Sequence, residues 1–172
     1  RFAVLASETD PFDPMEKAFK ELGDRYLDHG MRFTDWSLAH EYSLSPELLA
    51  LSHVWQSSVK GKYVIATKGA PEAVADLCHF DPDQLREIER QIDSMAADGL
   101  RILAVAKAEF SSDAWPASQH EFDFSFLGLI GLADPVRPEV PAAIKECNKA
   151  GVKVVMITSA ANRGWPGDVP VT

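Results

Sequence analysis

Residues 63–72 read Tyr-Val-Ile-Ala-Thr-Lys-Gly-Ala-Pro-Glu, and this stretch decides the fold. β-Branched and aromatic residues dominate residues 63–67, which predicts a strand. Gly69 breaks that strand and Pro71 suits the first turn of a helix, so we expect a short helix over 71–78. Lys68 between them would place an ammonium group beside backbone N–H groups, which can hold a phosphate. The alternative is that Lys68 only ends the strand.

The segments before this stretch predict two further strands of the sheet and a helix. A second strand-like run covers residues 49–59, and Lys60-Gly61 forms a turn, so the strands at 49–59 and 63–67 are expected to be antiparallel. Residues 36–44 alternate between apolar and polar and predict another strand, with one face formed by Trp36, Leu38, His40, Tyr42 and Leu44. Further upstream, Asp13-Pro14 with Glu16 is typical of a helix start, and helical spacing continues toward Gly30.

The segments after it predict a change of architecture. Asp81-Pro82 begins a long helix that Gly99 ends, and a strand at 100–108 and a loop at 111–120 follow. Two unbroken apolar runs, 126–133 and 152–158, flank a helical pattern, which favours a parallel βαβ unit. We therefore expect an antiparallel sheet flanked by helices over residues 1–123 and a partial α/β unit over 124–158. The tail, 159–172, is expected to be a disordered end or a remnant of cloning.

Composition excludes several classes of function. The chain has 172 residues and a formal net charge of −9, which argues against binding to nucleic acids or anionic membranes. No apolar run reaches the length of a membrane span and no signal peptide opens the chain, so we expect a soluble protein. Cys78 and Cys147 are expected to be reduced, and the five histidines to lie at the surface or half-buried, because no spacing predicts a metal site.

Several motifs occur in the order of one family. Lys68-Gly-Ala-Pro-Glu72 resembles the nucleotide-domain signature of the P-type cation-transporting ATPases. Five further segments are similar to that family's motifs: Asp13 to Glu16, Glu41 to Ser43 with Leu51-Ser52, Gly99 to Arg101, Asp134 to Pro138, and Val154 to Thr158. The resemblance covers roughly residues 3–158. It implies a nucleotide-binding domain over 1–123, followed by one partial βαβ unit of a haloacid-dehalogenase-like phosphorylation domain.

The resemblance implies roles for three residues on the adenine side. Tyr42 occupies the position of the aromatic residue that stacks on adenine, a contact that contributes about 1–3 kcal/mol. The alternative is a tyrosine of the core. Glu16 matches the carboxylate near the adenine amino group, with Asp13 as its neighbour. The alternative here is a capping box, because Asp-x-x-Glu at a helix start explains both acids structurally.

It also implies roles for five residues elsewhere in the site. Lys68 and Gly69 match the base of the nucleotide pocket, and Arg101 matches the arginine that steadies the phosphate end, unless it is a solvated strand residue. Arg137 lies in the hinge and is expected to reach ribose or phosphates. Thr158 ends the strand that leads to the family's Thr-Gly-Asp motif.

Some positions depart from the family pattern. Residues 46–50 lack the basic residue expected there, and Ser159-Ala160 replaces Gly-Asp after Thr158. The Asp-Lys-Thr-Gly-Thr segment that becomes phosphorylated and the aspartate pair that holds magnesium are not in the sequence. We therefore expect no catalytic residue and no metal site in this chain.

The implied function is the ATP-binding part of a membrane cation pump, on the cytoplasmic face of the membrane. The intact parent would hydrolyse ATP with Mg²⁺ through an aspartyl-phosphate. The expected partners are adenine nucleotide and the phosphorylation, actuator and transmembrane domains, and not nucleic acid. One alternative is a free-standing haloacid-dehalogenase-like phosphatase, which would need a nucleophilic aspartate after a strand. The other is a non-catalytic interaction domain, which an ATP titration would distinguish.

Overall fold

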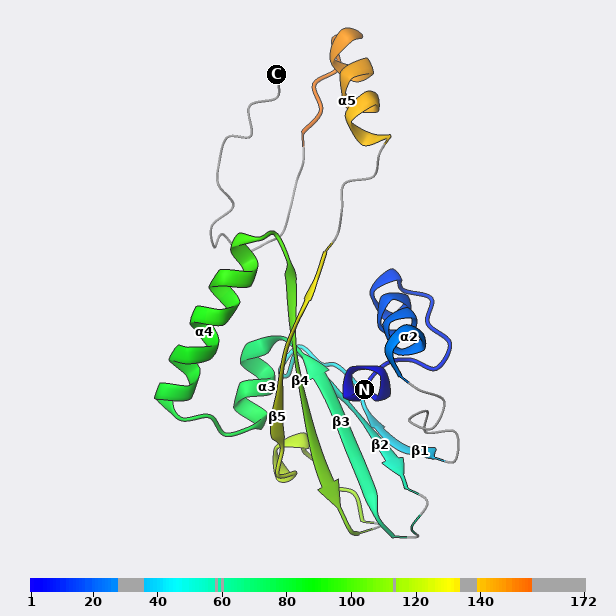
Figure 1. Cartoon of the computed structure of the whole chain (residues 1–172), viewed down its shortest axis with the longest axis vertical. Coiled ribbons are helices and arrows are strands. Elements are labelled where there is room, and N and C mark those ends of the chain that lie inside the picture. The colour runs from blue at the N-terminus through cyan, green and yellow to red at the C-terminus, as the bar shows by residue number, and fades with distance from the viewer. Residues whose placement is uncertain (28–35, 58, 60, 113, 134–138, 156–172) are drawn as a thin grey trace. The chain divides into compact units, whose positions relative to one another are not determined.

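The computed structural model describes residues 1–27, 36–57, 59, 61–112, 114–133 and 139–155. The chain divides into two compact units, Arg1–Asp134 and Pro135–Thr172 (Figure 1). The first unit carries all the described strands, and the second is described from residue 139 to residue 155.

One antiparallel sheet forms the centre of the first unit. Its strands are β1 (Ser37–Tyr42), β2 (Ala50–Gln56), β3 (Tyr63–Gly69), β4 (Arg101–Phe110) and β5 (Ser125–Leu132), and they lie side by side in the order of the sequence. The antiparallel pair expected at residues 49–59 and 63–67 is confirmed by β2 and β3, in which Leu51 faces Lys68.

Helices cover both faces of this sheet. Figure 1 shows α1 (Phe2–Leu5) and α2 (Pro14–Tyr26) on one side, and α3 (Pro71–Leu77) and α4 (Pro82–Ala97) on the other. On the α1/α2 face, Phe19 packs with Ala3 and Val105, and Leu5 and Ala6 with Ala66. The α3/α4 face is built on buried residues of the sheet, of α3 and of the segment before β5: Val54, Ile65, Val74, Leu77 and Phe122. The two faces of the sheet therefore carry separate layers of packing.

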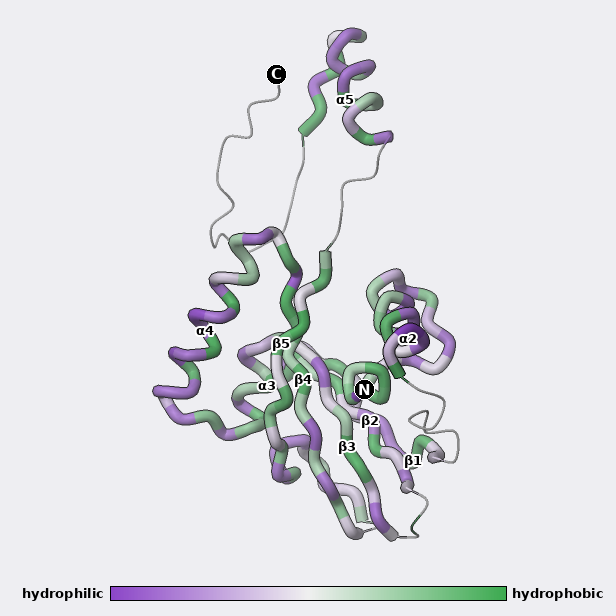
Figure 2. The backbone as a smooth tube through the Cα atoms, in the orientation of Figure 1, coloured by the Kyte–Doolittle hydropathy of each residue, from purple (hydrophilic) through white to green (hydrophobic). Residues whose placement is uncertain are grey.

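Helix starts follow the signals in the sequence. Asp13 caps α2 through Oδ1, which accepts hydrogen bonds from the amides of Met15 and Glu16. Asp81 and Gln84 form a complete capping box at the start of α4. Figure 2 shows the central strands as largely hydrophobic and α4 as largely hydrophilic, and Ile88 is the buried residue of α4. The helix expected to continue toward Gly30 ends at Tyr26, and Gly30 lies outside the described residues.

Strand β1 corrects the expected alternation. Leu38 pairs with Trp55, whereas His40 pairs with Val54, because the register shifts between them. Paired residues share one face of a sheet, and a bulge adds one residue to one strand. Leu38 and His40 therefore lie on opposite faces, and the single apolar face expected over residues 36–44 is wrong.

Strand β5 corrects the expected parallel pairing of residues 126–133. It is antiparallel to β4, with Leu132 opposite Arg101, and belongs to the same five-stranded sheet. Its half-buried hydrophobic residues contact both layers of packing: Ile130 and Leu132 pack toward α1 and α2, and Phe126 and Leu129 toward α3. Burial on both faces gives the same apolar pattern whether the neighbouring strand is parallel or antiparallel.

The second unit contains α5 (Val140–Lys149), where the sequence predicts a helix. Residues 152–155, the described part of the second expected strand, adopt no strand. The remainder of that strand and the tail, 159–172, lie outside the described residues. None of the helices in the described ranges is both long and apolar enough to cross a bilayer.

Candidate functional site

A buried ion pair joins two of the residues that the sequence singled out. Lys68 Nζ donates a hydrogen bond to Glu16 Oε1 at 2.5 Å, and only 3% of Lys68 and 8% of Glu16 are exposed. Alternation along β3 turns Ala66 and Lys68 toward α1 and α2, while Ile65 packs on the opposite face. The cap at Asp13 starts α2 so that Glu16 falls in its first turn, above the end of β3.

Ser7 completes this pair and was not predicted from the sequence. Its Oγ accepts a hydrogen bond from Lys68 Nζ at 2.7 Å and donates one to the carbonyl oxygen of Ala3 at 2.7 Å. Glu16 Oε2 accepts a hydrogen bond from the amide of Glu8 at 3.2 Å. A single serine after an apolar run gives no local signal of such a role, since its partner is 61 residues away.

The side chain of Glu16 therefore does not complete a capping box. Asp13 is the N-cap, as the alternative interpretation predicted, but both carboxylate oxygens of Glu16 bind elsewhere, to Lys68 and to the amide of Glu8. The carboxylate of Glu16 thus links α2 to β3 of the sheet and to the segment that connects α1 with α2.

Burial is the main cause of the shifted pKa of Lys68. Desolvation lowers its pKa from the ordinary value of 10.5, and it outweighs the hydrogen bond and charge of Glu16 and the charges of Glu8 and Asp13, which act in the opposite direction. The ring of Phe19 lies 4.7 Å from Nζ and adds a cation–π contact. The ammonium group is therefore held by local contacts against a net cost of desolvation.

The structure does not bring Tyr42 to this pair. Its hydroxyl donates to the carbonyl oxygen of Pro116 at 2.7 Å, and its ring meets the ring of Phe122 edge-on with centroids 5.5 Å apart. Both contacts belong to the core on the α3 face, opposite to Lys68. Burial, and then the charge of Glu121, raises the pKa of Tyr42 above 10.0. This packing agrees with the alternative interpretation of Tyr42 as a core residue.

Gly69 ends β3 and Arg101 begins β4, so both lie at the same end of the sheet, but their surroundings differ. A Cβ on Gly69 would lie 2.3 Å from the carbonyl oxygen of Leu49, so only glycine allows β2 to approach this closely. Arg101 is exposed at the start of β4, four residues before Val105 and hence on the face of Lys68, about 13 Å along the strand. Arg137 and Thr158 lie outside the described residues.

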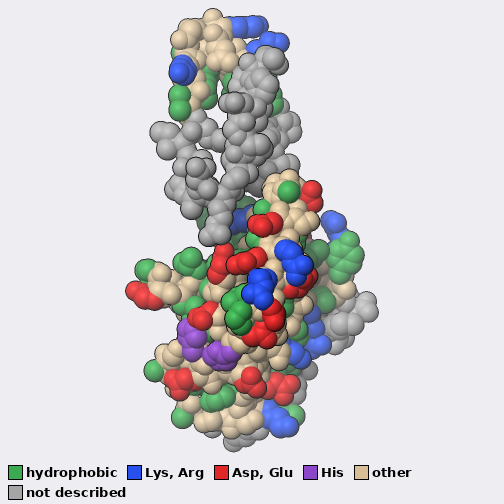
Figure 3. Space-filling model, turned by 90° about the vertical axis from the view of Figure 1, so that its left-hand side faces the viewer, with side chains coloured by type: hydrophobic (Ala, Val, Ile, Leu, Met, Phe, Trp, Pro, Cys, Tyr) green, Lys and Arg blue, Asp and Glu red, His purple; other side chains and the backbone are tan. Residues whose placement is uncertain are grey.

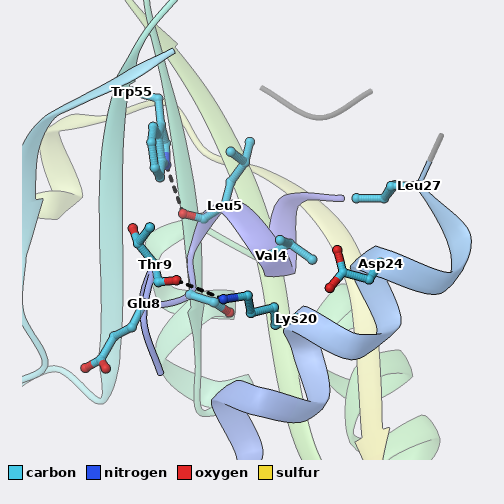
Figure 4. Close-up of a pocket in the computed structure, with 10 residues that line it drawn as sticks. Val4, Leu5, Glu8, Thr9, Lys20, Asp24, Leu27 and Trp55 are labelled. Carbon is cyan, nitrogen blue, oxygen red and sulfur yellow. Dashed lines mark hydrogen bonds between the residues drawn. The ribbon is translucent and has the colours of Figure 1, made fainter. Parts of the chain in front are cut away.

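A cavity of about 240 Å³ adjoins the network between α1, α2 and β2 (Figure 4). Ser7 and Glu8 line it, and Trp55, which also lines it, donates a hydrogen bond from Nε1 to the carbonyl oxygen of Leu5 at 2.9 Å. On the opposite side of the cavity, Lys20 Nζ donates to the carbonyl oxygen of Thr9 at 3.3 Å. The Lys68 network is therefore bordered by a small, mainly apolar hollow.

The histidines divide between the two faces. His53 is only 5% exposed, which corrects the expectation of surface or half-buried histidines, and its Nδ1 lies 3.0 Å from the carbonyl oxygen of Leu5. His120 is exposed, and its Nε2 lies 2.7 Å from Asp76 Oδ2. Figure 3 shows histidine side chains beside acidic ones on the side of the molecule that carries α3 and α4.

The described part of the chain holds no group of three or more side chains suited to a metal ion. Cys78 and Cys147 are both free, and burial raises the pKa of Cys78 to about 11, which makes its thiol unreactive. On the Lys68 face, Lys68, Glu16 and Arg101 supply hydrogen-bonding and charged groups.

Comparison with known proteins identifies the family to which this domain belongs. Residues 49–139, more than half of the chain, match the family described as P-type ATPase, cytoplasmic domain N. The chain belongs to this family. The matched part of domain N includes Lys68, Gly69 and Arg101, whereas Ser7 and Glu16 precede it.

This chain has relatives that are named as calcium-transporting or sodium/potassium exporting ATPases. It is 37% identical over 116 residues to a plasma membrane calcium-transporting ATPase 2 of Oreochromis mossambicus, and 32% identical over 136 residues to a calcium-transporting ATPase of Bacillus subtilis. It is 31% identical over 132 residues to a sodium/potassium exporting P-type ATPase of Schizosaccharomyces pombe. These stretches cover 58%, 73% and 71% of this chain but only 10%, 15% and 13% of the relatives.

Proposed function

We propose that this domain N binds adenine nucleotide on the sheet face that carries α1 and α2. The observation that supports this most is the Glu16–Lys68 pair. Two segments 52 residues apart, each similar to a motif of the family, supply one hydrogen-bonded pair at the end of β3. Lys68 Nζ has one N–H donor beyond those bonded to Ser7 and Glu16, which it can offer to a base, and Arg101 offers an exposed cation further along the same face.

Binding by this face is expected to be weak. Tyr42 packs on the opposite face, so the site has no stacking contribution from it, and both partners of the buried pair are already hydrogen-bonded. A dissociation constant on the order of 10⁻⁴–10⁻³ M fits such a site, because little new contact offsets the cost of association. Weak binding also suits a domain that must release its product.

For the parent protein we propose a P-type ATPase that hydrolyses ATP and moves a cation across a membrane. The named relatives differ in the ion that their names state, calcium or sodium and potassium, so the sequence match leaves the ion open. In this proposal Mg²⁺ is a cofactor of the intact parent protein. In this proposal α5 begins the phosphorylation domain, Arg137 serves as a hinge contact to nucleotide, and Thr158 ends the strand toward the Thr-Gly-Asp motif.

The test is an ATP titration followed by calorimetry and by amide chemical shifts. We expect saturable binding, with shifts concentrated at residues 7–16 and 66–69. Arg101→Ala should weaken binding several-fold, because an exposed cation near phosphates is lost without loss of packing. Arg86→Ala on α4 is the matched control, since it removes an exposed arginine from the other face of the sheet. An absence of saturable binding at about 10 mM ATP would overturn the proposal.

A further inference from the structure

The hydroxyl of Ser7 has a fixed orientation. Its proton is committed to the carbonyl oxygen of Ala3, four residues earlier, at 2.7 Å. A hydroxyl has one donor and two acceptor sites, so its lone pairs are left to face Lys68 Nζ, which lies 2.7 Å away. Ser7 is 5% exposed, so water does not compete freely for this position. The serine therefore acts on the lysine as a directed acceptor.

We infer that Ser7 is a positioning residue that holds the ammonium group of Lys68, in its charged form, against the carboxylate of Glu16 for nucleotide binding. The last step of this inference rests on the proposed function. The first step concerns only the buried network and is independent of any nucleotide.

The surroundings of Lys68 explain why its ammonium group depends on the hydroxyl of Ser7. The charged groups that act on Lys68 are Glu16 of α2 and the acids Glu8 and Asp13 of the segment before it. On the neighbouring strands, the residues paired with Lys68 are Leu51 and Val105, which are uncharged. The titratable side chains on the same face are His53 of β2 and Lys107 of β4, each two residues further along its strand. Burial lowers the pKa of Lys68 despite those acids, so the ammonium group depends on each hydrogen-bond acceptor it has.

Loss of the hydroxyl would have two effects. A hydrogen bond to the charged form of a group favours that form, so Ser7→Ala should lower the pKa of Lys68 further. The ammonium group would also lose one of the two hydrogen bonds that fix its place, keeping Glu16 Oε1 and the ring of Phe19. A lysine that is more often neutral, and less firmly placed, holds Glu16 and a bound nucleotide less well.

The experiment compares Ser7→Ala, Ser7→Thr and Ser52→Ala in the full chain. Ser52 is the matched control: it is fully buried, and its Oγ donates to Gln119 Oε1 at 2.6 Å on the face opposite to Lys68. The first readout is the titration of Lys68, followed by NMR of ¹³C-labelled lysine without nucleotide. We expect a clear downward shift of its pKa in Ser7→Ala, a value near wild type in Ser7→Thr, and no shift in Ser52→Ala.

The second readout is the affinity for ATP as a function of pH. The loss of affinity for ATP in Ser7→Ala relative to wild type should grow to about five- to tenfold as the pH rises through the range in which Lys68 deprotonates, because the variant loses that proton at a lower pH. Ser7→Thr should restore the profile. A general loss of stability would instead weaken binding without this dependence on pH.

An unchanged Lys68 titration in Ser7→Ala, or an equal shift in Ser52→Ala, would overturn the inference. A failure of wild type to bind ATP would overturn the proposed function and the nucleotide step with it. The lysine titration would still decide whether Ser7 controls Lys68, so the two failures can be told apart. If Ser7→Ala does not fold, Ser7→Cys removes the strong acceptor with little change in volume and is subject to the same lysine titration.

Discussion

Lys68 Nζ and Glu16 Oε1 lie 2.5 Å apart in the interior of the protein, although one belongs to the end of β3 and the other to the first turn of α2. The pKa of Lys68 is lowered overall, so the cost of removing the ammonium group from water exceeds what the carboxylate returns. A buried pair of this kind contributes little to stability relative to an apolar pair, but it is costly to break.

We therefore expect single and double substitutions of the pair to differ sharply. Lys68→Met and Glu16→Leu should each lower the free energy of unfolding by about 3–5 kcal/mol, because each leaves one buried charge unpaired. The double variant should recover most of that loss. Urea denaturation measures all three, with Arg90→Ala of the exposed Arg90–Glu87 pair as the control. Additive losses in the double variant would contradict this account.

The contribution of Lys68 to the stability of the wild-type protein should rise with pH in the alkaline range. Folding lowers the pKa of Lys68, so between that lowered value and the ordinary 10.5 the unfolded chain binds more protons than the folded one. In that window the contribution of Lys68 to the free energy of unfolding increases with pH, and the lysine ceases to oppose folding once it is neutral. The difference in urea midpoint between wild type and Lys68→Met isolates this contribution, and a difference that is flat with pH would argue against it.

Tyr42→Leu should affect stability and leave the affinity for ATP unchanged within about twofold. The ring fills part of the α3-side core and its hydroxyl bonds to Pro116, so we expect a loss of about 2–3 kcal/mol. Tyr42→Phe, which removes only the hydroxyl, should cost about 1 kcal/mol. Unfolding curves and ATP titrations of both variants measure the two effects. A tenfold loss of affinity in a stable Tyr42→Leu protein would instead support the stacking role that the family resemblance implies.

Gly69→Ala should be among the most destabilising single substitutions in the sheet. The added Cβ would lie 2.3 Å from the carbonyl oxygen of Leu49, and backbone atoms cannot yield as a flexible side chain can. We expect a loss of about 3 kcal/mol. Gly99→Ala is the control: its φ of +74° is strained for alanine, but no atom lies within 4 Å, so about 1–2 kcal/mol is expected. Thermal unfolding of the two variants compares steric and conformational costs directly.

The chain by itself should release no phosphate from ATP. Phosphoryl transfer in P-type ATPases needs a nucleophilic aspartate in an Asp-Lys-Thr-Gly setting, and this sequence has none. Groups that bind ATP and its transition state equally well do not accelerate hydrolysis. A phosphate-release assay on highly purified protein with Mg²⁺ checks this, and Asp134→Asn serves as the second sample. Turnover that this substitution abolishes would show that the chain is an enzyme in its own right.

Local signals predicted most of the elements. The caps at Asp13 and Asp81 locate the starts of α2 and α4, and the residue pattern before Gly69 locates β3, because hydrogen bonding and φ preferences act within a few residues. The side-chain directions in β1 were not predictable in the same way. A bulge between Leu38 and His40 reverses the alternation, and nothing in the two residues marks it.

Long-range contacts account for the rest of the site. The sequence supplied Glu16 and Lys68 only through family motifs, and their hydrogen bond depends on how α2 packs on the sheet. Ser7 was missed because its partners are set by the position of α1, which no local pattern specifies. The pairing of β5 was missed for a related reason, since an apolar strand does not encode the direction of its neighbour.

The order of the strands has a consequence for how the protein folds. Because β1 to β5 pair in sequence order, each strand can add to the one before it, and we expect the β2–β3 hairpin, whose strands are joined by a short connection, to close early at little entropic cost. The contacts of Ser7 and Glu16 with Lys68 span 61 and 52 residues and can form only after this hairpin exists. Substitutions in the β2–β3 hairpin should therefore slow folding, whereas substitutions at Ser7 should mainly speed unfolding, so that the candidate site is the last part of the domain to assemble.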